Sequence, residues 1–256
     1  MKRLAGRVAL ITGGGDGIGR AAALAFSREG AKVVIADINA TLGREAAELV
    51  SEALFVETDV TREESVRAAV EAAVARFGKL DTLFNCAGGS VPADKPVTEL
   101  DLSVFEHTIG LDLKGTMLAC KHAIPKIVAA GGGTVINMSS GAALRGASPA
   151  QVYTAAKGAI VSLTRSMAGT YAKGNVRVNC ICAGRIDTPR VRRTYGLPGR
   201  PGGVADPQDA NSQIKSYPFW VGTAEDIANI ALFLASDESR MITGAAIAAD
   251  GGRSAY

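Results

Sequence analysis

Short runs of apolar residues alternate with helical patterns along the whole chain. In Lys32–Asp37, for example, apolar residues follow one another without polar interruption, which is typical of a strand buried on both faces of a sheet. A strand followed by a helix and a second strand implies a crossover, so the alternation predicts a parallel sheet with helices on both faces. The expected strands are Val8–Thr12, Lys32–Asp37, Ala53–Thr58, Thr82–Asn85, Thr134–Met138, Arg177–Cys182 and Ala245–Asp250.

The segments between these strands carry small and apolar residues at helical spacing. Gly19–Glu29 follows the first strand, and Gly30 is expected to end it. Thr61 and Glu64 have the spacing of a capping box ahead of the amphipathic segment Val66–Phe77. The pattern predicts an α/β protein with a doubly wound, Rossmann-like fold and a seven-stranded parallel sheet. Further helices are expected at Thr116–Ala130, Gln151–Lys173 and Ala224–Ser236.

Residues 189–222 interrupt this alternation. The segment holds five of the nine prolines, five glycines and four arginines, and a long irregular insert in a compact domain is usually a lid or a binding loop. We therefore expect a substrate lid within a single domain that spans residues 1–256. Its arginines could meet an anionic substrate or could simply be solvated; they are Arg190, Arg192, Arg193 and Arg200.

The composition is that of an ordinary globular protein and argues against several classes of function. Of the 256 residues, 47% are hydrophobic and 21% are charged, and a net charge of +3 gives no argument for nucleic-acid or membrane partners. The uncharged stretch 127–144 is too rich in glycine and polar residues to cross a membrane, and Val8–Ile11 is too short for a signal peptide. We expect a cytoplasmic protein with reduced cysteines, which are Cys86, Cys120, Cys180 and Cys182.

His107 and His122 are the only histidines, and neither belongs to a cluster of metal-binding residues. We therefore expect no zinc site and no hydrolysis by a Ser-His-Asp triad, which needs a histidine base. Cys180 and Cys182 alternate along a predicted strand, so they should point to one face of the sheet as packing residues.

A glycine-rich turn follows the first predicted strand and opens the first predicted helix. It reads Thr12-Gly-Gly-Gly-Asp-Gly-Ile-Gly19. Glycines let the backbone approach a phosphate closely, and the helix N-terminus offers its free N–H groups to the anion. Asp37 ends the next strand, where a carboxylate can accept hydrogen bonds from both adenosine ribose hydroxyls and repel a 2′-phosphate. With no Lys or Arg in the turn before Arg20 and a second acid at Asp16, the sequence favours NAD over NADP.

Tyr153 and Lys157 are four residues apart in a predicted helix and therefore lie on one face of it. A tyrosine is a poor base by itself, but a nearby ammonium favours the phenolate form and brings its pKa toward the working range. Ser140 follows the fifth predicted strand, at the carboxyl edge where α/β sheets bind ligands. Its hydroxyl could hold a substrate oxygen beside the tyrosine.

On these residues the chain resembles the short-chain dehydrogenase/reductase family over essentially its whole length. The resemblance implies an NAD(H)-dependent oxidoreductase that interconverts a secondary alcohol and a ketone. Tyr153 would be the acid/base, Ser140 would orient the substrate oxygen, and Lys157 would bind the nicotinamide ribose. The matching motifs are Thr12–Gly19, Asp59-Val60, Asn85-Cys-Ala-Gly88, Ser140, Tyr153-x-x-x-Lys157, Ala183-Gly-x-x-x-Thr188 and Asp250-Gly-Gly252.

The resemblance also implies which residues hold the cofactor. Asp59 and Val60 would flank the adenine, Asn85–Gly88 would support the pocket, and Thr188 would reach the carboxamide. The full set is Gly13, Asp16, Gly17, Ile18, Gly19, Asp37, Ile38, Asp59, Val60, Asn85, Ala87, Gly88, Tyr153, Lys157, Gly184, Ile186 and Thr188.

The chain departs from the family pattern at three positions. Cys86 replaces a second asparagine, and Ala183 replaces a proline. Asp112, in Asp112-Leu-Lys-Gly115, stands where the family has a catalytic asparagine that is thought to hold a water near the lysine. We expect Asp112 to lie near Lys157, to raise the pKa of that ammonium and to move alcohol oxidation to more alkaline pH. The alternative is that Asp112 points away, or that backbone N–H groups hold it, and that it is a structural substitute.

Other functions stay open. Asp37 disfavours an NADPH-dependent 3-oxoacyl-(acyl-carrier-protein) ketoreductase, a non-catalytic NAD-binding sensor has no use for the acid/base group, and a methyltransferase has no reason to carry the Tyr-Lys helix. The resemblance suggests a homo-oligomer, commonly a tetramer, assembled partly through the helices at 116–130 and 151–173. Small residues after Ser140 and aromatic residues in 189–222 suggest an apolar alcohol or ketone, such as a cyclic one.

Overall fold

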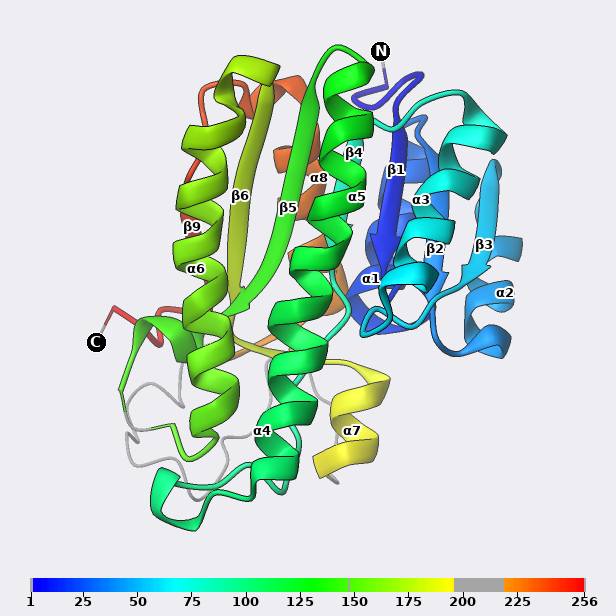
Figure 1. Ribbon diagram of the computed structural model, residues 1–256. Helices are drawn as coiled ribbons and strands as arrows, with labels where there is room; N and C mark the ends of the chain where they lie inside the picture. The colour runs from blue at the N-terminus through cyan, green and yellow to red at the C-terminus, as the bar shows by residue number, and fades with distance from the viewer. Residues whose placement is uncertain (1, 147, 196–218, 256) are drawn as a thin grey trace.

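Parallel strands form the central sheet of the computed structural model, which describes residues 2–146, 148–195 and 219–255. The seven strands of this sheet have the order β3-β2-β1-β4-β5-β6-β9. The predicted fold class, a single doubly wound α/β domain, is confirmed (Figure 1). The strands are β1 (Val8–Thr12), β2 (Lys32–Asp37), β3 (Ala53–Glu57), β4 (Thr82–Asn85), β5 (Gly133–Ser140), β6 (Val176–Ala183) and β9 (Ala246–Ala249).

Helices cover both faces of the sheet, as Figure 1 shows. Along β1, Ala9 and Ile11 pack against one layer of helices, whereas Val8 and Leu10 pack against the other. Each central strand is therefore buried on both sides, which is why its sequence is an unbroken apolar run. One layer holds α1 (Gly17–Arg28), α2 (Ala40–Glu48) and α8 (Ala224–Ala235), and the other holds α3 (Glu63–Phe77), α5 (Gly115–Ala129) and α6 (Gln151–Tyr171).

The capping box predicted ahead of α3 is wrong. The helix begins at Glu63, after Arg62, and no side chain caps its first turn. Thr61 instead donates its hydroxyl to Asp59 Oδ1 at 2.7 Å, and its backbone N–H donates to the same oxygen at 2.9 Å. A threonine held by a neighbouring aspartate in a turn is no longer available to the helix, because local side-chain hydrogen bonds compete with capping.

A continuous helical path joins α4 (Leu102–Thr108) to α5 through the π-helical segment Ile109–Lys114 (Figure 1). The sequence analysis predicted neither α4 nor this segment. Single π-helical turns inside longer helices occur frequently at functional sites, because the wider turn re-aims a side chain. Asp112 lies within this segment and is fully buried.

Residues 189–222 are not irregular throughout, contrary to the sequence prediction. The segment begins with α7 (Pro189–Tyr195) and ends with β8 (Val221–Thr223), which pairs in parallel with β7 (Arg185–Asp187). A proline fits the first turn of a helix because its missing N–H would have no partner there, so the proline at the start of α7 does not prevent helix formation. The rest of the predicted lid, residues 196–218, lies outside the described residues.

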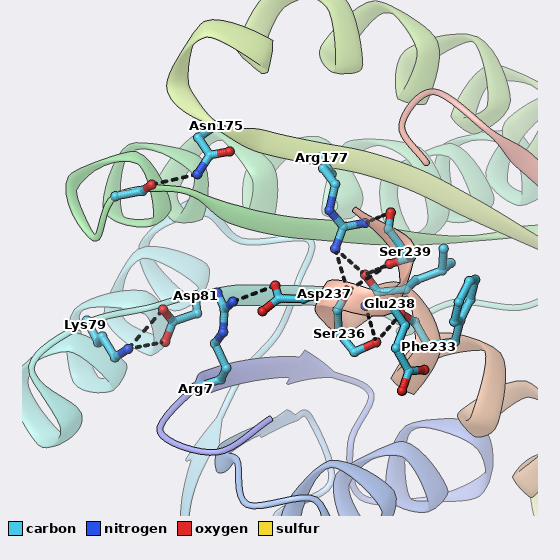
Figure 2. Close-up of polar contacts among 12 residues, drawn as sticks. Arg7, Lys79, Asp81, Asn175, Arg177, Phe233, Ser236, Asp237, Glu238 and Ser239 are labelled. Atoms are coloured by element: carbon cyan, nitrogen blue, oxygen red, sulfur yellow. Dashed lines mark hydrogen bonds and ion pairs between the residues drawn. The ribbon is translucent and has the colours of Figure 1, made fainter. Parts of the chain in front are cut away.

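Polar contacts fix the amino ends of the strands, away from the predicted site (Figure 2). Arg177, near the start of β6, donates to the carbonyl oxygens of Leu234 at 2.8 Å, Ser236 at 3.1 Å and Ser239 at 3.1 Å. The last carbonyl groups of a helix have no N–H partners within the helix, and the Arg177 guanidinium supplies the missing hydrogen-bond donors. Arg177 thus anchors the end of α8 to the sheet.

Candidate active site

A cavity of about 800 Å³ opens at the carboxyl ends of the strands. It includes the point between β1 and β4 where the strand order reverses, which is where open α/β sheets bind ligands. Ser140, Tyr153 and Lys157 line it, and so do all the predicted cofactor residues except Asn85. Residues from six different strand ends and from α6 and α7 therefore meet in one space large enough for an organic cofactor and a small substrate.

The backbone at the glycine turn lies so close to neighbouring backbone atoms that side chains at Gly13 and Gly19 would not fit. Gly13 has a φ of +65°, and a Cβ there would lie 2.9 Å from the backbone nitrogen of Ala87. A Cβ on Gly19 would collide with the carbonyl oxygen of Gly13. The first residues of α1 line the cavity directly behind this turn. Free backbone N–H groups at a helix N-terminus beside a glycine turn suit a pyrophosphate.

Asp37 lies at the same end of the cavity as the glycine turn. Its Oδ2 accepts a hydrogen bond from the Gly15 N–H at 2.9 Å, and its Oδ1 accepts one from the Asn39 N–H at 2.8 Å. Both bonds fix the orientation of the carboxylate. Each carboxylate oxygen can accept a second hydrogen bond, so the pair of ribose hydroxyls can be accommodated.

The Asp16 carboxylate is less available to a bound cofactor than the sequence suggested, because both of its oxygens have partners within the protein. Its Oδ1 caps α1 by accepting a hydrogen bond from the Gly17 N–H at 2.8 Å, and its Oδ2 lies 2.8 Å from the Arg193 guanidinium of α7. The positive charge of Arg193 therefore compensates the negative charge of Asp16, which was part of the argument for NAD over NADP. The expected discrimination against a 2′-phosphate would therefore depend on Asp37.

Tyr153 and Lys157 of α6 and Ser140 at the end of β5 line the cavity together, where α6 packs against β5. Lys157 Nζ lies 5.5 Å from the centre of the Tyr153 ring and donates a hydrogen bond to the Met138 carbonyl oxygen at 3.0 Å. The Ser139 hydroxyl donates to the Lys157 carbonyl oxygen at 2.8 Å and so holds α6 on β5. Ser140 Oγ accepts a hydrogen bond from the Ala142 N–H at 3.1 Å. Its own hydrogen can be donated to a ligand oxygen.

Asp94, which the sequence analysis missed, holds the N-terminus of α6. Its side chain is buried, Oδ1 accepts a hydrogen bond from the Val152 N–H at 3.1 Å, and Oδ2 accepts one from the Tyr153 N–H at 2.8 Å. A carboxylate there satisfies free N–H groups and interacts favourably with the helix dipole. Asp94 therefore fixes the backbone of Tyr153. It lies in a loop far upstream of α6, and Ala150 at the helix start gives no local sign that a cap is needed.

Asp112 and Lys157 form a buried ion pair. Asp112 Oδ1 lies 2.7 Å from Lys157 Nζ and accepts a hydrogen bond from the Gly89 N–H at 3.0 Å. Burial lowers the pKa of the Lys157 ammonium, but the charge of the Asp112 carboxylate raises it, and with smaller contributions from Tyr153 the net shift is upward. Asp112 therefore lies near Lys157, as expected, and does not point away from it, although a backbone N–H also holds the carboxylate.

Asn85 does not line the cavity. Its side chain turns into the sheet, where Nδ2 donates hydrogen bonds to Asn137 Oδ1 at 2.9 Å and to Cys120 Sγ at 3.3 Å. It supports the cavity wall from behind. The next residue, Cys86, lines the cavity, and burial raises the pKa of its thiol to about 12. A thiol with that pKa is protonated at neutral pH and is a poor nucleophile.

Two further arginines of α7 are held by neighbours. Arg190 donates a hydrogen bond to the Ser90 carbonyl oxygen at 2.7 Å, and Arg192 pairs with Asp187 at 2.7 Å. Both alternatives for these arginines, contact with an anionic substrate and solvation, stay open. Arg200 lies outside the described residues.

Within the part of the chain that the structure describes, no group of three or more His, Cys, Asp or Glu side chains could hold a metal ion. None of the helices in that part is both long enough and apolar enough to span a bilayer. Cys180 and Cys182 are buried together on β6 beside Ile160 and Val161 of α6, which confirms their predicted packing role.

The chain is similar to several known proteins. A family model described as enoyl-(acyl carrier protein) reductase matches residues 13–254. The chain is 39% identical to cis-4-hydroxycyclohexanecarboxylate dehydrogenase of Sinomonas cyclohexanicum, over 97% of this chain and 97% of that protein. It is 36% identical to (+)-borneol dehydrogenase 2 of Salvia officinalis, over 98% of this chain and 90% of that protein. The crystal structure of a short-chain dehydrogenase/reductase from Burkholderia xenovorans matches with a TM-score of 0.88 and 34% identity, covering 100% of this chain and 99% of that one.

Proposed function

The chain belongs to the short-chain dehydrogenase/reductase family and is an oxidoreductase that acts on CH–OH groups, and on this basis we propose that it uses NAD(H) to interconvert a secondary alcohol and a ketone. The observation that carries the proposal is that Tyr153 and Lys157 line the same cavity as the glycine turn and Asp37. Two relatives are named for dehydrogenation of alcohols on saturated rings. A small cyclic secondary alcohol is the substrate class that we propose.

Tyr153, Ser140 and Lys157 have separate roles in the proposed reaction. When bound, the nicotinamide would supply the acceptor or donor of the hydride. The Ser140 hydroxyl donates a hydrogen bond to the substrate oxygen, and the Tyr153 phenolate takes the proton of the alcohol as general base. In the reverse direction the Tyr153 hydroxyl gives that proton back to the ketone oxygen. Lys157, held by Asp112 and the Met138 carbonyl, stabilises the phenolate through its positive charge.

The cavity residues fit the rest of the cofactor. The glycine turn and the N-terminus of α1 would hold the pyrophosphate, and Asp37 would accept hydrogen bonds from the adenosine ribose. Asp59 and Val60 line the cavity beyond β3, where the adenine would lie. Ile186 and Thr188 also line it, and Thr188 would reach the nicotinamide carboxamide.

Replacing Asp37 tests the cofactor assignment. We expect the parent protein to prefer NAD strongly and the Asp37→Ala variant to narrow that preference by roughly 10- to 100-fold, because hydrogen bonds to a charged group contribute about 1.5–3 kcal/mol. The narrowing should come from weaker NAD binding more than from better NADP binding. Dissociation constants and kcat/KM for both cofactors measure it. A parent protein that uses NADPH as well as NADH would refute the ribose assignment and favour the acyl-carrier-protein ketoreductase alternative.

The Asp112→Asn variant tests the buried ion pair. Asparagine has the same shape and still accepts from the Gly89 N–H, but it lacks the negative charge that offsets the Lys157 ammonium. The full ammonium charge should then favour the Tyr153 phenolate, so activity is retained and the apparent pKa of the alcohol-oxidation profile decreases. The measurement is kcat/KM against pH. Superimposable profiles of variant and parent would show that Asp112 does not couple to the Tyr-Lys pair.

Family membership excludes the methyltransferase alternative. A non-catalytic NAD-binding sensor differs from the proposed enzyme in a simple observable. A sensor would bind NADH with no turnover of any secondary alcohol or ketone, whereas the enzyme should reduce NAD in the presence of a cyclic alcohol at alkaline pH.

We also propose a cytoplasmic homotetramer. The two helices expected at its interface, α5 and α6, lie on the same face of the sheet (Figure 1), and Met117 and Val128 of α5 are exposed apolar residues there. Sedimentation at micromolar protein concentration is the test, and a monomer would contradict the proposal.

A further inference from the structure

The charged residues that line the cavity come from different elements of the fold. The acids follow β1, β2 and β3; they are Asp16, Asp37 and Asp59. The cations come from the segment after β5 and from α6, β7 and α7; they are Arg145, Lys157, Arg185, Arg190 and Arg193. Among the described residues, no acid that lines the cavity comes from the end of β5 or from α6, the elements that contribute Ser140 and Tyr153.

Charge compensation differs among these cations. Arg193 pairs with Asp16 at 2.8 Å, and Lys157 pairs with Asp112 at 2.7 Å. Arg190 donates to a neutral acceptor, the Ser90 carbonyl oxygen, and pairs with no acid among the described residues.

Arg145 differs from its neighbours because its guanidinium makes no hydrogen bond or ion pair with the described residues, although it lines the cavity and is exposed. It follows Ser140 across one short helical turn, Gly141–Leu144. That turn leaves the end of β5, which is two strands away from β1 in the sheet. Two strand spacings are roughly 10 Å, and Arg145 lines the cavity from the segment that follows Ser140.

We propose that the alcohol substrate carries a carboxylate and that Arg145 binds it as a specificity-determining residue. The inference rests on the proposed function, since it names a substrate class for the same site. A planar guanidinium matches a carboxylate through two parallel N–H···O bonds. The positive charge of Arg190 adds to the attraction from a second wall of the cavity. The substrate is then an amphipathic molecule whose hydroxyl meets Ser140 and Tyr153 and whose anionic group meets Arg145.

The test compares two probes that differ only in charge, a hydroxycyclohexanecarboxylate and the corresponding hydroxycyclohexanecarboxamide. The parent protein should oxidise the acid with a kcat/KM at least about 10-fold above that of the amide, since a charge-assisted hydrogen bond contributes that much. Arg145→Gln should lower kcat/KM for the acid about 10- to 100-fold, mainly through KM, and change the amide by less than about threefold. The matched control is Arg67→Gln, which removes the same charge from the exposed surface of α3. It should change neither value.

A binding measurement makes the result independent of turnover. Calorimetry with NADH-saturated protein should detect cyclohexanecarboxylate binding to the parent and to Arg67→Gln, and binding at least about 10-fold weaker to Arg145→Gln. Equal use or equal binding of acid and amide by the parent would overturn the inference while leaving the alcohol dehydrogenase proposal intact. The same holds if Arg145→Gln weakens both probes equally. Selective carboxylate binding without oxidation of any alcohol would support the inference and contradict the proposed reaction.

Discussion

The Tyr153→Phe variant should lose about 10²- to 10⁴-fold in turnover, the usual contribution of a general acid/base, and should keep its affinity for NAD. Phenylalanine keeps the ring beside Lys157 and the backbone N–H that donates to Asp94, so the N-terminus of α6 stays in place. Only the transferable proton is lost. The residual rate should then come from Ser140 and from the positions of the bound reactants.

Turnover of a cyclic alcohol at saturating NAD and the dissociation constant of NADH together measure this effect. Tyr171→Phe is the matched control, because it removes a hydroxyl from the same helix outside the cavity, and we expect parent-like turnover. Turnover of Tyr153→Phe close to that of the parent would remove Tyr153 from its role as the acid/base.

Replacing Lys157 should have the second large effect, because this residue has two functions. Lys157→Ala removes the charge that favours the phenolate and the proposed ligand of the nicotinamide ribose. We therefore expect turnover to fall and NADH binding to weaken together. The same change leaves the Asp112 carboxylate buried without its cation, and breaking a buried ion pair costs about 3–5 kcal/mol of unfolding free energy.

The double variant Lys157→Ala with Asp112→Asn separates the two effects. It removes the unpaired buried charge, so urea unfolding should recover much of the lost stability, whereas turnover should stay low. A Lys157→Ala protein with parent-like stability would mean that Asp112 is protonated or solvated after the change. Recovery of turnover in the double variant would contradict the role of the ammonium at Tyr153.

The sequence by itself determined the strands and those site residues whose location follows from adjacent residues in the chain. The strands were predicted because a strand buried on both faces must be an apolar run, as β1 and β2 are. The glycine turn, Asp37 and Ser140 followed because they come directly after such runs, and the carboxyl ends of parallel strands meet at one edge of the sheet. Tyr153 and Lys157 followed because four residues of helix place two side chains on one face.

Other features depend on contacts between residues far apart in the chain, and only the tertiary structure decided them. Asp94 holds the N-terminus of α6 from a distant loop. The capping box predicted for α3 does not form because the Thr61 hydroxyl donates its hydrogen bond to Asp59 instead. The sequence placed Asp112 in register with a family position. Asp112 makes its 2.7 Å contact with Lys157 from a π-helical segment that no local pattern predicts. The same reason applies to the arginines at the cavity, since the sequence contains their charges but only the fold determines which acids compensate them.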